Sequence, residues 1–420
     1  MAGSTGANSS SNSSPAPPPP KILLAKPGLV PGGPISSKIG RGPGADDEAA
    51  SIRSRLPSLG SLNLLSDSWD LHIDRFLPFL TENTEFKVVG IIGPPGVGKS
   101  TIMNEIYGYD GSSPGMLPPF PILSEDVRAM ARHCTLGIEP RISSERIILL
   151  DTQPVFSPSV LAEIMRPDGS STVSVINGES LSAELAHELM SIQLGILLAS
   201  ICNIVLVISE GVHDLNMWHL MLTVDLLKHG LPDPSSPISS HAQNSNVASE
   251  KEYKEKTSTS EEYLATPIFV HAKVQDRDLV PHNILQLKRA FAYYFKTSSF
   301  MGDKFEKVHS EQLLSSVVPD TRNLDVDGED RRLLLIPNRN KDDSTRGQYE
   351  SFKLALWKLR DQVLSMKGAS FPRTVSERDW LKNSLKIWES VKSSPIVMEY
   401  ARTLQSSGLT VTLELEVSDW

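Results

Sequence analysis

The sequence contains few of the features that would direct a chain of this length out of the cytosol. It has only two cysteines, Cys134 and Cys202, too few for a disulfide framework or a zinc site of paired thiolates. No basic segment followed by an apolar run opens the chain, so no secretion signal is indicated. The most apolar window, 192–208, is 17 residues long and is interrupted by polar side chains, whereas a bilayer span takes roughly 20 apolar residues. We therefore expect no membrane insertion, and we expect the cytoplasm, or else the nucleus, as the compartment.

Acidic residues are missing from the first 45 positions, where four basic residues occur. This segment carries +4 of a total formal charge of −9, which leaves −13 on the remainder of the chain. An acidic body disfavours broad electrostatic attraction to the phosphates of nucleic acids. We expect no direct sequence-specific binding of nucleic acid.

Composition divides the chain of 420 residues into a tail, one large domain and an extension. Residues 1–60 are rich in Ser, Gly and Pro, and such a segment cannot bury enough apolar surface to offset its loss of conformational entropy. Residues 232–262 are polar and lack an apolar period, which predicts a disordered insertion. The domain is expected to span 67–366, and residues 367–420 are expected to add a helix and a strand.

Strand and helix patterns alternate between these stretches. The domain is predicted to begin with a helix from Asp67 to Leu80, and the short spacing between strands at 137–142 and 146–150 predicts a hairpin. The other predicted strands cover 86–92, 204–208, 267–271 and 333–336, and the other predicted helices cover 181–196, 214–228, 284–295 and 349–363. This alternation predicts an α/β fold with a mixed sheet and helices on both of its faces.

The strongest motif is Gly93-Pro94-Pro95-Gly96-Val97-Gly98-Lys99-Ser100, a full match to the phosphate-binding loop pattern between a buried strand and a helix. In such a P-loop the glycines let backbone amides turn toward the α- and β-phosphates, and the following helix offers its positive end. Lys99 is expected to contact the β- and γ-phosphates, the Ser100 hydroxyl to bind Mg²⁺, and Thr101 to contact the α-phosphate. A glycine-rich turn without a ligand is the alternative, which the strand–loop–helix setting disfavours.

Two further oxygens are candidates for the metal. The strand at 146–150 ends in Asp151, which supplies the second carboxylate that P-loop hydrolases use to hold Mg²⁺ through water. Thr135, upstream of the preceding strand, is a candidate for the threonine that completes the coordination; an ordinary loop threonine is the alternative. The predicted metal set is therefore Ser100, Asp151 and Thr135, with ATP or GTP, or the corresponding diphosphate, as the nucleotide.

Two positions depart from the pattern of active GTPases. Where the D-x-x-G motif places a glycine amide on the γ-phosphate, this chain has Pro154, which has no N–H to donate. Where N-K-x-D reads guanine, the sequence is Ala272-Lys273-Val274-Gln275, so the lysine is kept and the aspartate is replaced, with Asp276 one position late. We expect Lys273 to help bind the nucleotide, little discrimination between guanine and adenine, and absent or very slow hydrolysis.

Three stretches carry a family resemblance. They are the P-loop followed by Thr101-Ile-Met-Asn, the run Arg132-His133-Cys134-Thr135 before Gly-Ile-Glu, and Leu-Leu-Asp151-Thr-Gln-Pro154. With this combination the chain resembles the ninth-factor family of the SMG proteins of nonsense-mediated mRNA decay, from about residue 67 to the carboxyl terminus. The resemblance implies a degenerate G-like P-loop domain that forms a heterodimer with the eighth SMG factor. Through that partner it implies regulation of the PI3K-like SMG kinase, which phosphorylates the RNA helicase of the pathway.

Two classes of function stay open. One is a regulatory, scaffold-like subunit in which bound nucleotide stabilises a protein interface, and the other is an active P-loop NTPase switch of the GTPase or dynamin-like type. Pro154 and Gln275 favour the first, because a switch needs a specific hydrogen bond at each of these positions. A nucleotide kinase ranks last, since the sequence has no arginine cluster beyond Arg331-Arg332 that could serve as a lid.

The carboxyl-terminal extension has two clear patterns. A helix is predicted from about Glu377 to Val391, where Ser376 and Asp379 resemble a capping box. Leu409–Val417 alternates apolar and polar residues, which predicts a strand. A lone strand leaves its amides unpaired, so this one is expected to add to a sheet edge of this protein or of a partner.

Overall fold

The computed structural model describes residues 62–66, 69–111, 117–122, 132–165, 175–176, 179–235, 262–300, 332–339 and 350–407. All of them belong to one compact unit, Leu59–Trp420. The predicted tail, nearly all of the predicted insertion at 232–262 and the predicted strand Leu409–Val417 lie outside the described residues.

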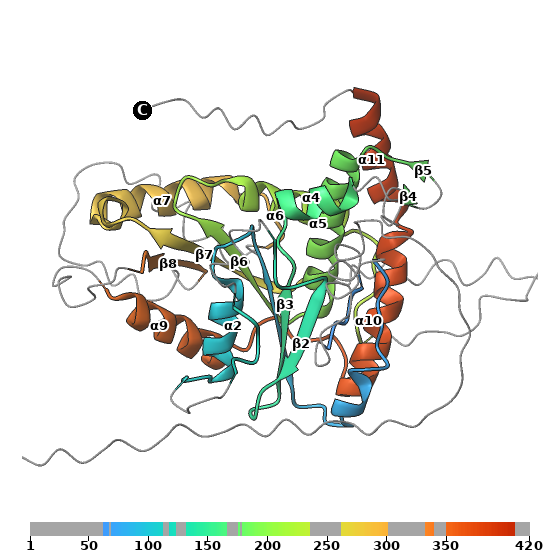
Figure 1. Cartoon of the computed structure of the whole chain (residues 1–420), viewed down its shortest axis with the longest axis horizontal. Coiled ribbons are helices and arrows are strands. Elements are labelled where there is room, and N and C mark those ends of the chain that lie inside the picture. Colours follow the sequence, from blue (N-terminus) through green and yellow to red (C-terminus); the bar gives the residue numbers. More distant parts are fainter. Residues whose placement is uncertain are drawn as a thin grey trace, which may run out of the picture. The chain divides into compact units, whose positions relative to one another are not determined.

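A six-stranded mixed sheet forms the centre of the unit, in the order β2-β3-β1-β6-β7-β8 (Figure 1). All neighbouring strands are parallel except β2 and β3, which form the predicted antiparallel hairpin. The strands are β1 (Lys87–Ile92), β2 (Ile138–Ile142), β3 (Ile147–Thr152), β6 (Ile204–Glu210), β7 (Thr266–Val274) and β8 (Leu333–Pro337), and a separate pair is formed by β4 (Val175–Ile176) and β5 (Glu179–Ser180). Because β1, β3, β6 and β7 are parallel, their carboxyl ends meet at one edge, which is where open α/β sheets bind ligands.

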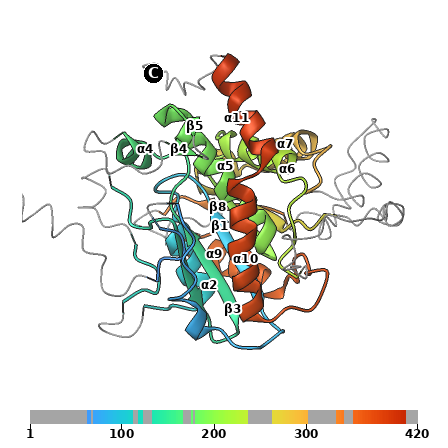
Figure 2. The same cartoon turned by 90° about the vertical axis from the view of Figure 1, so that its right-hand side faces the viewer.

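Helices cover both faces of the sheet, as the sequence predicts (Figures 1 and 2). Alternate side chains of β1 divide between two cores: Val89 and Ile91 face α2 and α9, whereas Val88 and Ile92 face α5 and its neighbours. The first core contains α2 (Lys99–Tyr107) and α9 (Phe352–Ser365), and the second contains α4 (Pro158–Ile164), α5 (Ala183–Ile201), α6 (Asn216–Leu227), α7 (Pro281–Tyr294), α10 (Glu377–Lys392) and α11 (Pro395–Ser407). The fold is therefore a P-loop G-domain-like α/β fold.

The central helix of the second core is α5. It is long and apolar enough to cross a membrane by length and composition, yet 83% of its apolar window is buried inside the protein. Ser182 caps its first turn by accepting a hydrogen bond from the amide of Leu185. The helix therefore has the burial of a core helix of the fold.

The prediction of a helix at the start of the domain, from Asp67 to Leu80, is wrong. The only helical residues that the structure describes there form a short 3₁₀ turn, η1 (Leu77–Phe79). Leu65 instead pairs in antiparallel bridges with Leu71 and with Ile138 on β2. The physical reason is Trp69, which adopts a left-handed φ of 62° so that its buried indole can donate to Gln193 at 2.9 Å and pack against Trp388. Tertiary burial overrides the local helical period at this position.

The carboxyl-terminal helix α10 begins at the predicted cap. The Ser376 hydroxyl accepts from the Asp379 amide at 3.2 Å, which confirms Ser376 as the N-cap residue. The same hydroxyl donates to the Asp379 carboxylate at 3.0 Å, whereas in a capping box that carboxylate would accept from the Ser376 amide. α10 packs on α5, where the Trp380 indole donates to the carbonyl of Ile201 at 2.8 Å. The helix α11, which sequence analysis missed, follows it and also packs on α5.

Candidate nucleotide site

The P-loop connects the end of β1 to the first turn of α2, as predicted. Gly96 and Gly98 have φ values of 74° and 93°, a left-handed conformation that glycine adopts without strain. A Cβ at Gly93 would lie 2.6 Å from the carbonyl oxygen of Ile208 on β6. The glycines of the motif are thus required by the backbone of the loop and by its close approach to β6.

Lys99 is the first residue of α2 and folds back over the P-loop. Its Nζ donates to the carbonyl oxygens of Gly93 at 2.9 Å and of Pro94 at 3.0 Å. Burial lowers the pKa of Lys99 to about 8, against the opposing effect of the Asp151 carboxylate, which favours the charged amine. The ammonium group therefore lies in the loop that would surround a phosphate, and it loses its charge at a lower pH than an exposed lysine would.

The three residues predicted to bind the metal meet at one point. The hydroxyls of Ser100 and Thr135 both donate to Oδ2 of Asp151, at 2.7 and 2.9 Å. Asp151 is fully buried at the end of β3, and burial raises the pKa of its carboxyl, with Lys99 the main opposing influence. Its second oxygen, Oδ1, is buried and has no hydrogen-bond partner in the described part of the chain.

These residues fit a magnesium-bound nucleotide. A buried carboxylate oxygen without a partner is costly, and a cation or an ordered water would satisfy it. The described residues include no group of three or more His, Cys, Asp or Glu side chains that could hold a metal ion. A cation here would therefore be held by Ser100, Thr135 and Asp151 together with phosphate oxygens, which is how P-loop proteins hold Mg²⁺.

Lys273, the predicted base-side residue, lies beside the P-loop. It adopts a φ of 58° near the end of β7, and its Nζ would be 3.9 Å from a Cβ placed on Gly96. The same amine forms an ion pair with Glu210 at the end of β6, at 2.9 Å. Gln275 and Asp276 follow with exposed side chains, Asp276 in the first turn of the 3₁₀ helix η3 (Asp276–Leu279). Glu210 is a residue of this region that sequence analysis did not identify.

Pro154 follows β3 at the side of the P-loop. The next amide, that of Val155, donates to the carbonyl of Gly93 at 3.2 Å. Gln153 is buried, and its side-chain Oε1 accepts from the amide of Gly137 at 3.0 Å. The glutamine that precedes Pro154 is therefore bonded to a backbone amide of the loop that carries Thr135.

His133 is a second residue whose position the sequence did not predict. Its Nδ1 lies 2.8 Å from the hydroxyl of Ser159 in α4, and its Nε2 lies 3.8 Å from Glu163. Burial, together with a smaller effect of the positive charge of Lys99, lowers the pKa of His133 to about 4. Only its place in the run Arg132-His133-Cys134-Thr135 could have drawn attention to it.

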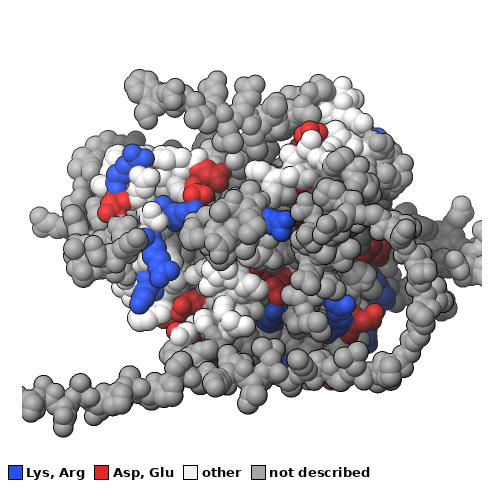
Figure 3. Space-filling model, viewed as in Figure 1, with Lys and Arg blue, Asp and Glu red and all other residues white. Residues whose placement is uncertain are grey.

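The charged side chains on one face of the unit are interspersed rather than gathered by sign (Figure 3).

The chain is similar to known proteins both in the P-loop region and over most of its length. A model of the NB-ARC domain, which matches residues 69–112, covers β1, the P-loop and α2. The chain is 29% identical over 415 residues to the nonsense-mediated mRNA decay factor SMG9 of Xenopus tropicalis, a match that covers 91% of this chain and 76% of that protein. The SMG9 of Salmo salar is 26% identical over 365 residues, which cover 81% of this chain and 67% of that protein. Over a shorter stretch of 109 residues, the SMG9 of Caenorhabditis elegans is 29% identical.

A solved septin GTPase domain from Chlamydomonas reinhardtii is 10% identical, with a TM-score of 0.26, and the match covers 76% of this chain and 98% of that one. A likeness of that size adds nothing to the topology described above.

The sheet order and the P-loop define a P-loop protein with a G-domain-like fold. Within that class the expected resemblance is confirmed: the chain is a relative of the SMG9 factors over most of its length. This homology supports a place among the factors of nonsense-mediated mRNA decay.

Proposed function

We propose that the chain is a nucleotide-binding regulatory subunit of the kinase complex of nonsense-mediated mRNA decay, acting in the cytoplasm. In this proposal it forms a heterodimer with the eighth SMG factor and, through it, controls the PI3K-like SMG kinase. The observation that carries the nucleotide part is the convergence of Lys99, Ser100, Thr135 and Asp151 at the P-loop. The homology to SMG9 factors supports the place in the pathway.

The proposed ligand is a nucleoside diphosphate or triphosphate with Mg²⁺. The backbone amides of Gly93 to Ser100 and the Lys99 ammonium would hold the phosphates. Ser100, Thr135 and Asp151 would hold the cation, which neutralises phosphate charge when bound. The stem of Lys273, fixed by Glu210, would support the base beside Gly96.

Absent or very slow hydrolysis follows from two residues after β3. Pro154 has no amide to offer a γ-phosphate, and the side chain of Gln153 is engaged with the amide of Gly137 instead of a water. Both observations favour a subunit that uses nucleotide structurally over the alternative, an active NTPase switch of GTPase or dynamin-like type.

The nucleotide proposal is tested by extracting the nucleotide from purified protein and identifying it by chromatography. Lys99→Ala should lose most of this nucleotide, because it removes the charge that faces the β/γ-phosphates. Unchanged retention in that variant would refute the proposal. Competition between ATP and GTP measures base selection, for which we expect a small ratio; a preference of a hundredfold or more, about 2.7 kcal/mol, would contradict this expectation.

The partner proposal is tested by co-purification with the eighth SMG factor and by kinase assays with and without this chain. Deletion of Leu409–Trp420, the part that contains the predicted strand, should weaken co-purification while nucleotide retention stays intact. A folded truncation that binds the partner as well as the full chain does would show that the predicted strand is not part of that interface.

A further inference from the structure

Two segments that face the P-loop are bonded directly to each other. One is the threonine loop, residues 132–137, which carries Thr135 into the metal site. The other is the carboxylate segment, residues 151–159, which begins with Asp151 and runs into α4. In GTPases the two corresponding segments are ordered by the γ-phosphate and Mg²⁺ and are released on hydrolysis. The contacts that hold these two segments therefore decide whether the site can respond to a γ-phosphate.

Two sets of hydrogen bonds, here called braces, join these segments. The first brace joins Gln153 to Gly137, at the end of the threonine loop. The amide of Gly137 donates to Oε1 of Gln153 at 3.0 Å, and the amide of Gln153 donates to the carbonyl of Gly137 at 2.8 Å. Gln153 is buried, with 9% of its surface exposed, so water competes little for these hydrogen bonds.

The second brace joins His133, near the start of the threonine loop, to Ser159. The two side chains are 2.8 Å apart, and Ser159 in turn contacts the hydroxyl of Ser157 at 2.8 Å. Ser157 is fully buried, and its amide donates to Nε2 of His187 in α5 at 3.2 Å. The threonine loop is thus tied through α4 to the central helix of the core.

Thr135 lies between the two braces, where its hydroxyl reaches Asp151. Neither brace uses that hydroxyl or any amide of the P-loop, so neither competes with a phosphate for its partners. A ligand can shift a conformational equilibrium only where a second state is populated. Braces at both ends of the loop reduce the population of the open state before the terminal phosphate can act on it.

We propose that Gln153 and His133 are positioning residues that keep the threonine loop closed on the carboxylate segment with a diphosphate as well as with a triphosphate. The site then responds to the presence of nucleotide and not to its terminal phosphate. This inference rests on the proposed nucleotide-binding function and adds how that site is regulated.

The chain contains its own probe for this proposal. Cys134 is a half-buried free thiol within the threonine loop, and the only other cysteine, Cys202, is fully buried. The rate at which a thiol reagent modifies Cys134 therefore reports opening of the loop, and a Cys134→Ser variant assigns the signal. The rate is measured on the full chain with Mg²⁺ and ADP, then with Mg²⁺ and a non-hydrolysable ATP analogue, and the guanine pair is run in the same way.

For the wild-type chain we expect rates with diphosphate and triphosphate that differ by less than about threefold. Gln153→Met removes the acceptor for the Gly137 amide at similar volume, and Ser159→Ala removes the partner of His133. In each variant the open state becomes populated, so the triphosphate should slow modification by about threefold or more relative to the diphosphate. The matched control is Gln193→Met. Gln193 is a buried residue of α5 that accepts a hydrogen bond from the Trp69 indole, and its substitution should leave the behaviour of the wild type.

If the role of Gln153 were only structural, Gln153→Met would weaken the fold, and the rate of Cys134 modification would stay the same with diphosphate and with triphosphate. The proposal is overturned if the triphosphate slows modification of the wild-type thiol by threefold or more, or if neither Gln153→Met nor Ser159→Ala gains a nucleotide dependence. Binding of each nucleotide is measured separately by calorimetry. Failure to bind any nucleotide refutes the proposed function and this inference with it, whereas normal binding with a nucleotide-dependent wild-type rate refutes this inference alone.

Discussion

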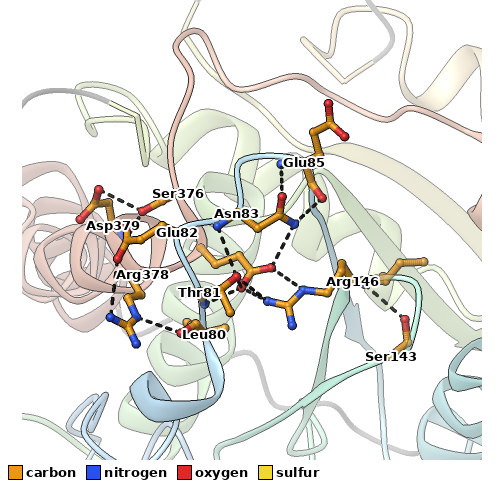
Figure 4. A network of polar contacts seen from close by, with 12 residues as sticks. Leu80, Thr81, Glu82, Asn83, Glu85, Ser143, Arg146, Ser376, Arg378 and Asp379 are labelled. Atoms are coloured by element: carbon orange, nitrogen blue, oxygen red, sulfur yellow. Dashed lines mark hydrogen bonds and ion pairs between the residues drawn. The ribbon is translucent and has the colours of Figure 1, made fainter.

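Arg146, in the turn of the β2–β3 hairpin, binds the carboxylate of Glu377, the first residue of α10 and 231 positions away in the sequence. Figure 4 shows Arg146 and Thr81 in this network of polar contacts. Its Nε donates to Oε1 at 2.8 Å, and its Nη2 contacts Oε2. Thr81 donates to Oε2 of the same carboxylate from its amide at 2.8 Å and from its hydroxyl at 3.0 Å. Glu377 is fully buried, so this carboxylate joins the hairpin, the segment before β1 and the carboxyl-terminal helix.

Arg146→Met should lower the free energy of unfolding by about 3 kcal/mol, because it leaves a buried carboxylate without its counter-charge. Urea unfolding followed by circular dichroism measures the change. The matched control is Lys382→Met, which removes an exposed ion pair with Asp379 and should cost about 1 kcal/mol or less. Equal losses in the two variants would mean that the buried pair contributes no more than a surface pair.

Substitution of two left-handed glycines separates backbone strain from steric overlap. Gly137 has a φ of 55°, and a Cβ there would lie 1.8 Å from the carbonyl oxygen of Leu65; Gly211 has a φ of 64° and open space around the same position. Gly211→Ala should cost about 1 kcal/mol of stability from strain alone. Gly137→Ala should cost about 3 kcal/mol or more, because the backbone of Leu65 must move. Thermal unfolding of both variants decides the matter, and similar melting temperatures would contradict the close contact.

Nucleotide affinity should fall as the pH rises above about 8. Burial lowers the pKa of Lys99 to about 8, so above that value the free protein loses the charge that attracts phosphate, and binding must first restore the proton. Between pH 7 and pH 9 we expect a loss of about tenfold in affinity, measured by calorimetry. Lys99→Met should bind weakly with no such slope. A wild-type affinity that stays constant up to pH 9 would show that the lysine keeps its proton at the site.

Turnover of ATP or GTP should be far slower than the rate of order 1 per second that is common among enzymes. The reason is that Pro154 lacks an amide and that Gln153 is held by Gly137. A phosphate-release assay measures the rate, with Lys99→Ala as the control for contaminating activity. Turnover at or above that rate which disappears in Lys99→Ala would establish an active NTPase.

The sequence predicts those parts of the fold whose signal is local. The stretches 86–92 and 204–208 are predominantly apolar, and they occur as β1 and β6. The P-loop follows from its own spacing, and Asp151 from its place at the end of a buried strand. Ser376 predicts the start of α10 because a cap needs only its neighbours in the chain.

Features that depend on distant partners could not be predicted in this way. The segment around Trp69 has a helical period but is drawn into the core by Gln193 and Trp388. The buried roles of Gln153 and His133 depend on Gly137 and Ser159, which only the fold brings near. Local periodicity contains no information about such contacts.

The antiparallel bridge between Leu65 and Ile138 lies on the outer side of β2, which is an edge strand of the sheet. The amide of Leu64 also donates to the carbonyl of Ile138 at 2.7 Å, so the chain itself occupies hydrogen-bonding groups at this edge. Exposed strand edges are sites at which protein chains aggregate, and a covered edge is protected against this. Loss of the segment before β1 would therefore expose unpaired hydrogen-bonding groups at the edge of β2 as well as weaken the core. A truncated chain that begins at β1 should self-associate.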